Sequence, residues 1–171
     1  CIQNNHEIVA LANLYPANGK EELDSYMYQS VGHDAIEAFA RCCELPLYRQ
    51  PICGSPVNQQ YDYVATDSDE VEDLYSLLQT VLNAHPDIQG VSSGAIHSTY
   101  QKNRVEDVCR RLGLTSLAYL WNADQPALLA EMIDVGLEAV IIKTAVMGLG
   151  RVDLMKTLGE LQPKLLELKD K

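Results

Sequence analysis

The stretch from residue 90 to residue 112, GVSSGAIHSTYQKNRVEDVCRRL, constrains the fold most, because a short strand, a glycine and a helix follow one another without spare residues. The residues before Gly94 are expected to form the strand, and Gly94 is expected to let the backbone turn. Ser98 and Gln101 have the S-x-x-Q spacing of a capping box, so the helix should begin at Thr99. A strand, a turn and a capped helix in this order are typical of α/β proteins.

The amino end of this helix is a candidate anion site. The first turn of a helix presents backbone N–H groups and the positive end of the helix dipole, which suit a phosphate or a carboxylate. Lys102 and Arg104 strengthen this preference for an anion with their positive charge. A capped helix after a strand is also common in α/β proteins where no ligand binds, so the local pattern alone leaves a purely structural role open.

Composition narrows the possible partners. The sequence of 171 residues has 13 basic and 24 acidic residues and a net charge of −11, which would repel a nucleic-acid backbone. It contains no apolar run of about 18 residues, so no membrane-spanning helix is expected. The five cysteines are odd in number and include no C-x-x-C, which argues against a disulfide framework or a zinc site. We therefore expect reduced thiols and a cytoplasmic protein, with Cys42 and Cys43 serving in packing.

Strands and helices are expected to alternate along the chain, which predicts an open parallel sheet with helices on both faces. The expected strands are residues 7–14, 45–50, 90–93, 116–121 and 137–146. The expected helices are residues 24–44, 67–81, 99–112 and 124–135, followed by a last helical segment from Thr157 that Pro163 divides, and residues 51–66 form a loop or lid. We expect one α/β domain over residues 1–122 and part of a second, smaller α/β lobe over residues 123–171.

Lys143 interrupts the apolar strand expected at residues 137–146. A charge in such a strand is costly unless its ammonium group reaches water or an anion. Both outcomes are open, so Lys143 is either a solvated side chain or a substrate contact.

Three segments resemble one family. The first carries the pattern G-A-I-x-S-x-Y-Q-x-x-R-V-E, here Gly94, Ala95, Ile96, Ser98, Tyr100, Gln101, Arg104, Val105 and Glu106. It is similar to the signature of the diphthine-ammonia ligase family, ATP pyrophosphatase-like enzymes of diphthamide synthesis. SYMYQSVGHDAI and LAYLW resemble the same family. In the second segment His33 could contact a ligand, although a packed or solvated histidine is the commoner case.

This resemblance implies an adenine nucleotide alpha hydrolase-like fold, a nucleotide-binding domain over residues 1–122, and the start of a substrate lobe beyond it. It also implies that ATP and Mg2+ activate the diphthine carboxylate of elongation factor 2 as an acyl-adenylate, and that ammonia then displaces AMP. Seven residues would bind substrate or nucleotide: Gly94, Ser98, Tyr100, Gln101, Lys102, Arg104 and Lys143. Ser98 and the N–H groups of Tyr100 and Gln101 would receive the anion, and Lys102 and Arg104 would balance its charge. The side chains of Tyr100 and Gln101 would orient the substrate. No catalytic residue and no metal ligand is assigned.

The sequence also departs from the family pattern. The family's first strand lies centrally, beside the strand before GAIHSTYQ, and leads into a phosphate loop SGGKDS, but neither that loop nor the family's GEGGEYET segment occurs here. We therefore expect a truncated form with exposed strand edges and low stability. The alternative is a non-catalytic nucleotide-binding or protein-interaction module on the same fold. A flavodoxin-like or universal-stress-like domain would explain the alternation of elements but not the three motifs.

Overall fold

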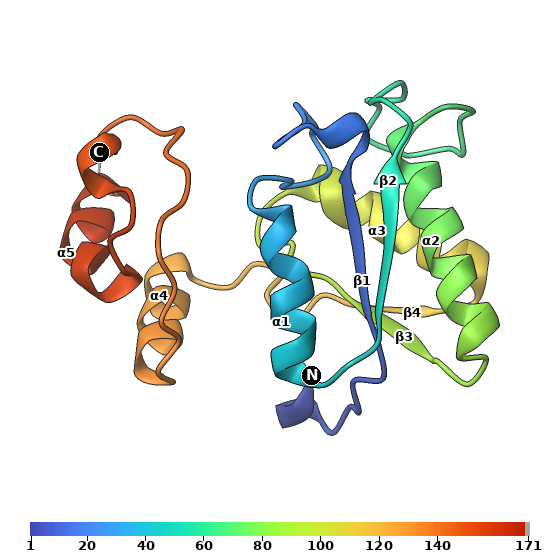
Figure 1. Cartoon of the computed structure of the whole chain (residues 1–171), viewed down its shortest axis with the longest axis horizontal. Coiled ribbons are helices and arrows are strands. Elements are labelled where there is room, and N and C mark those ends of the chain that lie inside the picture. Colours follow the sequence, from blue (N-terminus) through green and yellow to red (C-terminus); the bar gives the residue numbers. More distant parts are fainter. Residues whose placement is uncertain (170–171) are drawn as a thin grey trace. The chain divides into compact units, whose positions relative to one another are not determined.

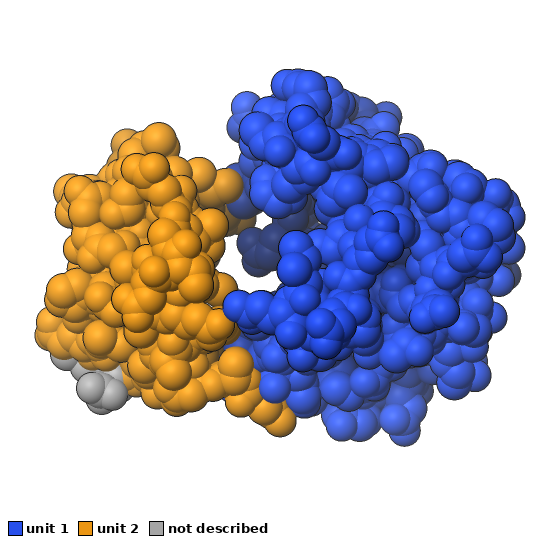
Figure 2. Space-filling model, turned by 90° about the horizontal axis from the view of Figure 1, so that it is seen from below, with its two compact units in different colours: residues 1–121 blue, residues 122–171 orange. Residues whose placement is uncertain are grey.

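The computed structural model describes residues 1–169 and divides into two compact units, Cys1–Trp121 and Asn122–Lys171 (Figure 2). The first unit contains β1 (Leu11–Pro16), α1 (Ile36–Cys43), β2 (Leu47–Ile52), α2 (Glu70–Ala84), β3 (Gly90–Ser92), α3 (Thr99–Leu112) and β4 (Thr115–Leu117). The second contains α4 (Gln125–Asp134) and α5 (Leu158–Lys169), and Figure 1 shows the course of each unit.

The strands of the first unit form two parallel pairs. β1 pairs with β2, with Leu11 opposite Leu47, and β3 pairs with β4, with Gly90 opposite Thr115. Parallel pairing with intervening helices confirms the predicted α/β class. Within the described residues, however, β1 and β3 are not hydrogen-bonded to each other, so the strands make two short sheets.

Helix α2 holds the two pairs together, because it contacts β1, β2 and α3. One face buries Leu77 against Leu14 of β1, and the adjacent face buries Leu78 against Val108 of α3. Removing one such side chain from water contributes about 1.5–3 kcal/mol. The apolar spacing of α2 thus builds the core on both of its sides.

A large apolar groove separates the two strand pairs. It encloses about 1250 Å³, and its lining comes from the edges of β1 and β3 and from the inner faces of α2 and α3. Ala12, Leu14, Leu78, Val91 and Gln101 are among its lining residues. Within residues 1–169, β1 and β3 each have a single strand neighbour, so the groove lies between two strand edges.

The first strand differs from its predicted position. β1 begins at Leu11 and runs through Pro16, whereas the expected strand covered residues 7–14. Burial alternates along it, with Leu14 and Pro16 buried, whereas burial on both faces was expected. The reason is that, among residues 1–169, β1 pairs with β2 alone, while Ile8 and Val9 border the groove and remain partly exposed.

The helix expected over residues 24–44 is wrong in its first half. The Ser25 hydroxyl accepts hydrogen bonds from the backbone N–H groups of Met27 and Tyr28, which stabilises a turn in place of a helix. Gly32 then adopts a left-handed conformation (φ 76°), and α1 begins only at Ile36. The turn lets Met27 enter the core against α3. Cys42 and Cys43 are both exposed, so the predicted packing role is wrong.

The second unit is mainly helical. The strand expected at residues 137–146 is reduced to a single antiparallel bridge between Val140 and Thr157, which a backbone hydrogen bond between Ile141 and Lys156 accompanies. Thr157 and Glu160 cap each other's backbone at the start of α5, as predicted. α5 continues through Pro163, although a break was expected there. No helix among residues 1–169 is long and apolar enough to cross a bilayer.

Candidate functional site

The amino ends of α2 and α3 meet at the carboxyl rim of the strands. After β2 the chain returns to the start of α2, where Ser55 forms a parallel bridge with Asp69. A Cβ atom on Gly54 would lie only 2.6 Å from the backbone of Asp69 and Glu70, so glycine is required for this approach. The segment expected to be a loop or lid is therefore tied to the start of α2.

The start of α3 confirms one half of the predicted capping box. The Ser98 hydroxyl oxygen accepts the backbone N–H of Gln101 at 3.3 Å, and Gly113 ends the helix at φ 71°. The other half is wrong, because the Gln101 amide donates to the Met27 carbonyl oxygen at 2.9 Å and does not return to Ser98. The Gln101 side chain therefore holds the turn before α1 and also borders the groove.

Gly94 lies on the wall of the groove, but the backbone does not require a glycine there. Its φ is not in the left-handed region, and a Cβ atom at this position would meet no atom within 4 Å. The chain bends instead at Ile96 and His97. The turn predicted at Gly94 is thus displaced toward the start of α3.

Tyr100 and Arg104 pack against each other below the first turn of α3. The guanidinium carbon of Arg104 lies 3.3 Å from the centroid of the Tyr100 ring and 5.2 Å from that of Tyr63. Arg104 is fully buried and donates to the carbonyl oxygens of Asn58, Gln60 and Tyr100. Burial raises the pKa of the Tyr100 hydroxyl. In this arrangement the Arg104 guanidinium faces protein groups.

Lys102 lies on the outer side of the same turn. Its ammonium group pairs with the Glu106 carboxylate at 2.6 Å and lies 5.4 Å from the centroid of the Trp121 indole. Its side chain keeps 25% of its surface accessible, which leaves the ammonium group able to meet a ligand. Trp121 itself is only partly buried. Lys143 belongs to the second unit.

Two acidic residues at the start of α2, Asp69 and Glu70, are buried. Acids in the first turn of a helix complement its dipole and need no burial, but each of these is only 1% exposed. The Asp69 carboxylate caps α2 by accepting the N–H of Val71, and it also accepts the N–H of Asn58 at 2.7 Å. The Glu70 carboxylate accepts the Ser25 hydroxyl at 2.7 Å. Because neighbouring acids are common at helix starts, only the turn-forming Ser25 could have suggested a buried partner.

Burial dominates the electrostatics of this cluster. It raises the pKa of the Glu70 carboxyl group, and the hydrogen bond from Ser25 opposes that rise. It also raises the pKa of the Tyr28 hydroxyl, which donates to the Glu70 carbonyl oxygen at 2.9 Å. One oxygen of Glu70, Oε1, is buried without a hydrogen-bond partner among the described residues. Such an orphan acceptor is costly and calls for a structural or functional reason.

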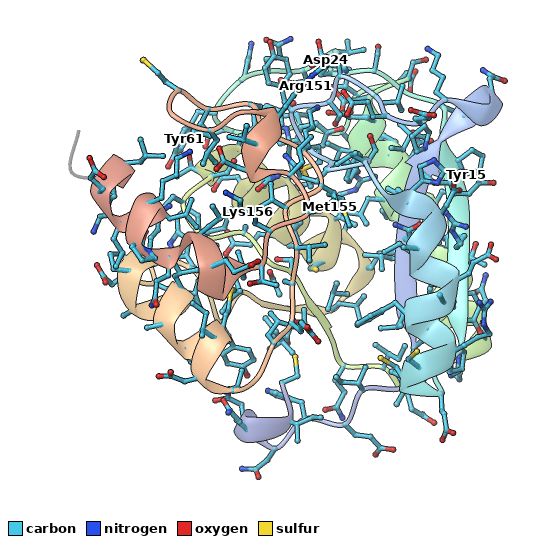
Figure 3. All side chains as sticks on the ribbon, turned by 60° about the vertical axis from the view of Figure 1, so that its left-hand side comes forward. Tyr15, Asp24, Tyr61, Arg151, Met155 and Lys156 are labelled. Atoms are coloured by element: carbon cyan, nitrogen blue, oxygen red, sulfur yellow. The ribbon has the colours of Figure 1, made fainter. Side chains whose placement is uncertain are left out.

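His33 lies at the rim above β1. Its ring stacks on Tyr15 at a centroid distance of 6.1 Å, and its carbonyl oxygen accepts the Arg49 guanidinium at 3.0 Å. The same guanidinium lies over the Tyr15 ring, whose position Figure 3 labels. The ring of His33 is therefore engaged in packing.

The residues at the rim fit an anionic ligand in part. The helix start, its dipole and Lys102 suit a phosphate, but the N–H of Gln101 is already donated to Ser98. Among residues 1–169 no group of three His, Cys, Asp or Glu side chains could hold a metal ion. The groove beside Gly94 and Gln101 provides open space next to the helix start. These groups could therefore hold the phosphate end of a nucleotide, and they supply no assembled metal site.

Comparison with known proteins gives a consistent result. Residues 2–116 match the model of the diphthamide synthase N-terminal domain. The whole chain is 57% identical to a diphthine-ammonia ligase of Schizosaccharomyces pombe, of which it covers 28%. It is also 53% and 50% identical to the proteins of that name from Rattus norvegicus and Homo sapiens, of which it covers 65% each. The chain thus spans between 28% and 65% of the length of these three relatives. From the model match and these identities, the chain belongs to the diphthamide synthase N-terminal domain family.

Proposed function

We propose that this chain is part of an enzyme that uses ATP, with Mg2+, to amidate the diphthine carboxylate of elongation factor 2 with ammonia. The observation that carries this proposal is the match of residues 2–116 to the family model, together with relatives named diphthine-ammonia ligase. The cytoplasm, where elongation factor 2 acts in translation, is the expected location.

The residues at the start of α3 would bind the phosphate part of ATP. Ser98 and the N–H of Tyr100 lie in the first turn, and the Lys102 ammonium group lies beside it. The dipole of α3 and the Lys102 charge would favour an anion there, and Gly94 leaves room at the groove wall. ATP supplies a good leaving group to a carboxylate that otherwise resists a nucleophile, so the task of these residues is positioning and charge stabilisation.

The second unit would contribute to the protein substrate. We propose that residues 123–171 begin the lobe that receives elongation factor 2, and that Lys143 belongs to its binding surface. The exposed apolar side chains of Ile142, Val146 and Met147 in this segment suit a protein contact.

The test is an assay of AMP and pyrophosphate formation by this chain with ATP, ammonium and elongation factor 2 carrying diphthine. Release of AMP should require all three substrates, whereas a first turnover of pyrophosphate should require only ATP and elongation factor 2. Lys102→Met should lower both rates more than the matched variant Arg110→Met at the other end of α3. Unchanged rates in Lys102→Met would remove Lys102 from the site. ATP binding without pyrophosphate formation would instead support the second candidate.

That second candidate is a non-catalytic nucleotide-binding or protein-interaction module. The observation that favours it is the start of α3, where Lys102 and the helix dipole suit a phosphate while the Gln101 N–H is already donated to Ser98. The start of α3 alone would then bind phosphate without positioning it for transfer.

A further inference from the structure

Two charged side chains, Arg104 and Glu70, lie at the amino ends of α3 and α2 and are almost completely removed from solvent. A buried charge is tolerated only when hydrogen bonds and an opposite charge compensate it. The burial of these two residues therefore costs free energy that the surrounding contacts must offset.

Arg104 connects α3 to the segment between β2 and α2. Its Nη2 donates to the carbonyl oxygens of Asn58 and Gln60, and its guanidinium plane covers the Tyr100 ring. The planar guanidinium can make these bonds and this stack together, which an ammonium group cannot do. Asn58 in turn donates its N–H to Asp69, the cap of α2. Arg104 thus reaches the start of α2 through one short hydrogen-bonded path.

Glu70 makes the second connection. It accepts the Ser25 hydroxyl from the turn that places Met27 in the core, and the Gln101 side chain of α3 holds that same turn. Glu70 Oε1 and Arg104 Nε are both buried without a hydrogen-bond partner among the described residues, one an acceptor and the other a donor. The positive charge of Arg104 also stabilises the Glu70 carboxylate.

We infer that Arg104 and Glu70 are a buried pair of positioning residues, which fixes the amino end of α3 against that of α2 and so holds the anion site at Ser98 in place without touching the ligand. This inference rests on the proposed function, because the anion site is part of that proposal. It gives Arg104 an indirect role in place of direct contact with phosphate.

The test compares Arg104→Ala with Arg110→Ala, a matched change at an exposed arginine of the same helix. Hydrogen exchange reports the backbone of residues 56–66 and of the first turn of α3, and calorimetry reports the affinity for ATP. In Arg104→Ala we expect the exchange of residues 56–66 to become about tenfold faster and ATP binding to weaken about tenfold. Arg110→Ala should change neither.

Chemical rescue separates positioning from contact. Methylguanidinium, far below denaturing concentrations, should enter the space left by Arg104→Ala, restore the slow exchange and recover ATP affinity in parallel. Weakened ATP binding with unchanged exchange would show direct contact and overturn the inference. Faster exchange with unchanged ATP affinity would also overturn it.

Two further measurements keep the test decisive. If Arg104→Ala does not fold, Arg104→Lys is used, and it should show the same loss of slow exchange because lysine cannot reproduce the planar contacts. Glu70→Gln should accelerate exchange at the start of α3, and an unchanged rate would remove Glu70 from the pair. If the unmodified chain binds no ATP, the proposed function fails, while the exchange measurements still decide whether the pair holds the two helices.

Discussion

The amino ends of α2 and α3 and the groove between β1 and β3 are neighbouring regions of the first unit with opposite character. At the helix ends, buried charged groups are joined to backbone and side chains by a continuous set of hydrogen bonds. In the groove, apolar side chains and two strand edges surround about 1250 Å³ of space. The comparison teaches that this chain's own residues hold the polar part of the site, whereas its strands within residues 1–169 form two separate pairs.

The strongest test of the packing at the amino ends of α2 and α3 is Gly54→Ala. The new methyl group would lie 2.6 Å from the backbone of Asp69 and Glu70, so the segment after β2 must move away from α2. We expect a loss of about 3 kcal/mol in the free energy of unfolding, measured with urea. Gly94→Ala is the control, because its methyl group meets no atom within 4 Å, and should change stability by less than about 0.5 kcal/mol. Equal losses would contradict the tight packing assigned to Gly54.

The groove between β1 and β3 should make the chain self-associate. Two strand edges flanking an apolar groove invite pairing with another chain. Ala12→Lys places an ammonium group on the exposed, groove-lining side of β1, and should weaken association about thirtyfold, or about 2 kcal/mol, in sedimentation experiments. Ala38→Lys adds the same charge on the exposed face of α1, outside the groove, and should have little effect. A chain that stays monomeric at all concentrations would refute the prediction.

The sequence predicted the local signals of this fold well. The cap at Ser98, the end at Gly113 and the apolar spacing of α2 and α3 are short-range features that depend on neighbours within one or two turns. Parallel strands with helices between them followed from the same periodicity. The start of α3 was therefore predicted from sequence alone, and the ligand-binding role of its residues stays a prediction.

What could not be predicted depends on partners distant in the chain. The hydroxyl of Ser25 ends the expected helix by forming a local turn, but the turn is stabilised by Glu70 and by Gln101, which are far away in sequence. The ends of strands β1 and β4 differ from the predicted ends because the length of a strand is set by the strand beside it. The burial of Asp69 and Glu70 is likewise a tertiary property that a count of acids at a helix start does not reveal.

A smaller effect on the free energy of unfolding is expected for the ion pair between Glu72 of α2 and Arg111 of α3. Glu72 accepts two hydrogen bonds from Arg111, at 2.8 and 2.6 Å, and one from the Tyr63 hydroxyl. Since both charged side chains keep more than a fifth of their surface exposed, Glu72→Gln should cost about 1–2 kcal/mol at neutral pH.

The pH dependence of this pair checks its origin. The hydrogen bond from Arg111 lowers the pKa of the Glu72 carboxyl group below its ordinary value. The stabilisation is therefore fully present above the unfolded-state pKa, about 4.3, and is lost as the pH falls through the lowered folded-state pKa. The difference in urea midpoint between Glu72→Gln and the unmodified chain should shrink over that acidic range. A difference that does not change with pH would exclude the charge of Glu72 as its cause.

Lys102→Met should have the smallest effect on stability. It therefore best distinguishes a loss of ATP binding from a loss of folding at the start of α3. Lys102 and Glu106 lie one helical turn apart and are partly exposed, so loss of their ion pair should lower the free energy of unfolding by only about 0.3–0.5 kcal/mol. Methionine keeps the apolar contact with Trp121. If the start of α3 binds phosphate, the same change should weaken ATP binding about threefold, because one nearby positive charge is removed. Arg110→Met, in the last turn of α3, provides the matched loss of charge and should leave ATP affinity unchanged. Equal weakening by both variants would mean that ATP senses only the net charge of the protein, and it would take the ligand away from the start of α3.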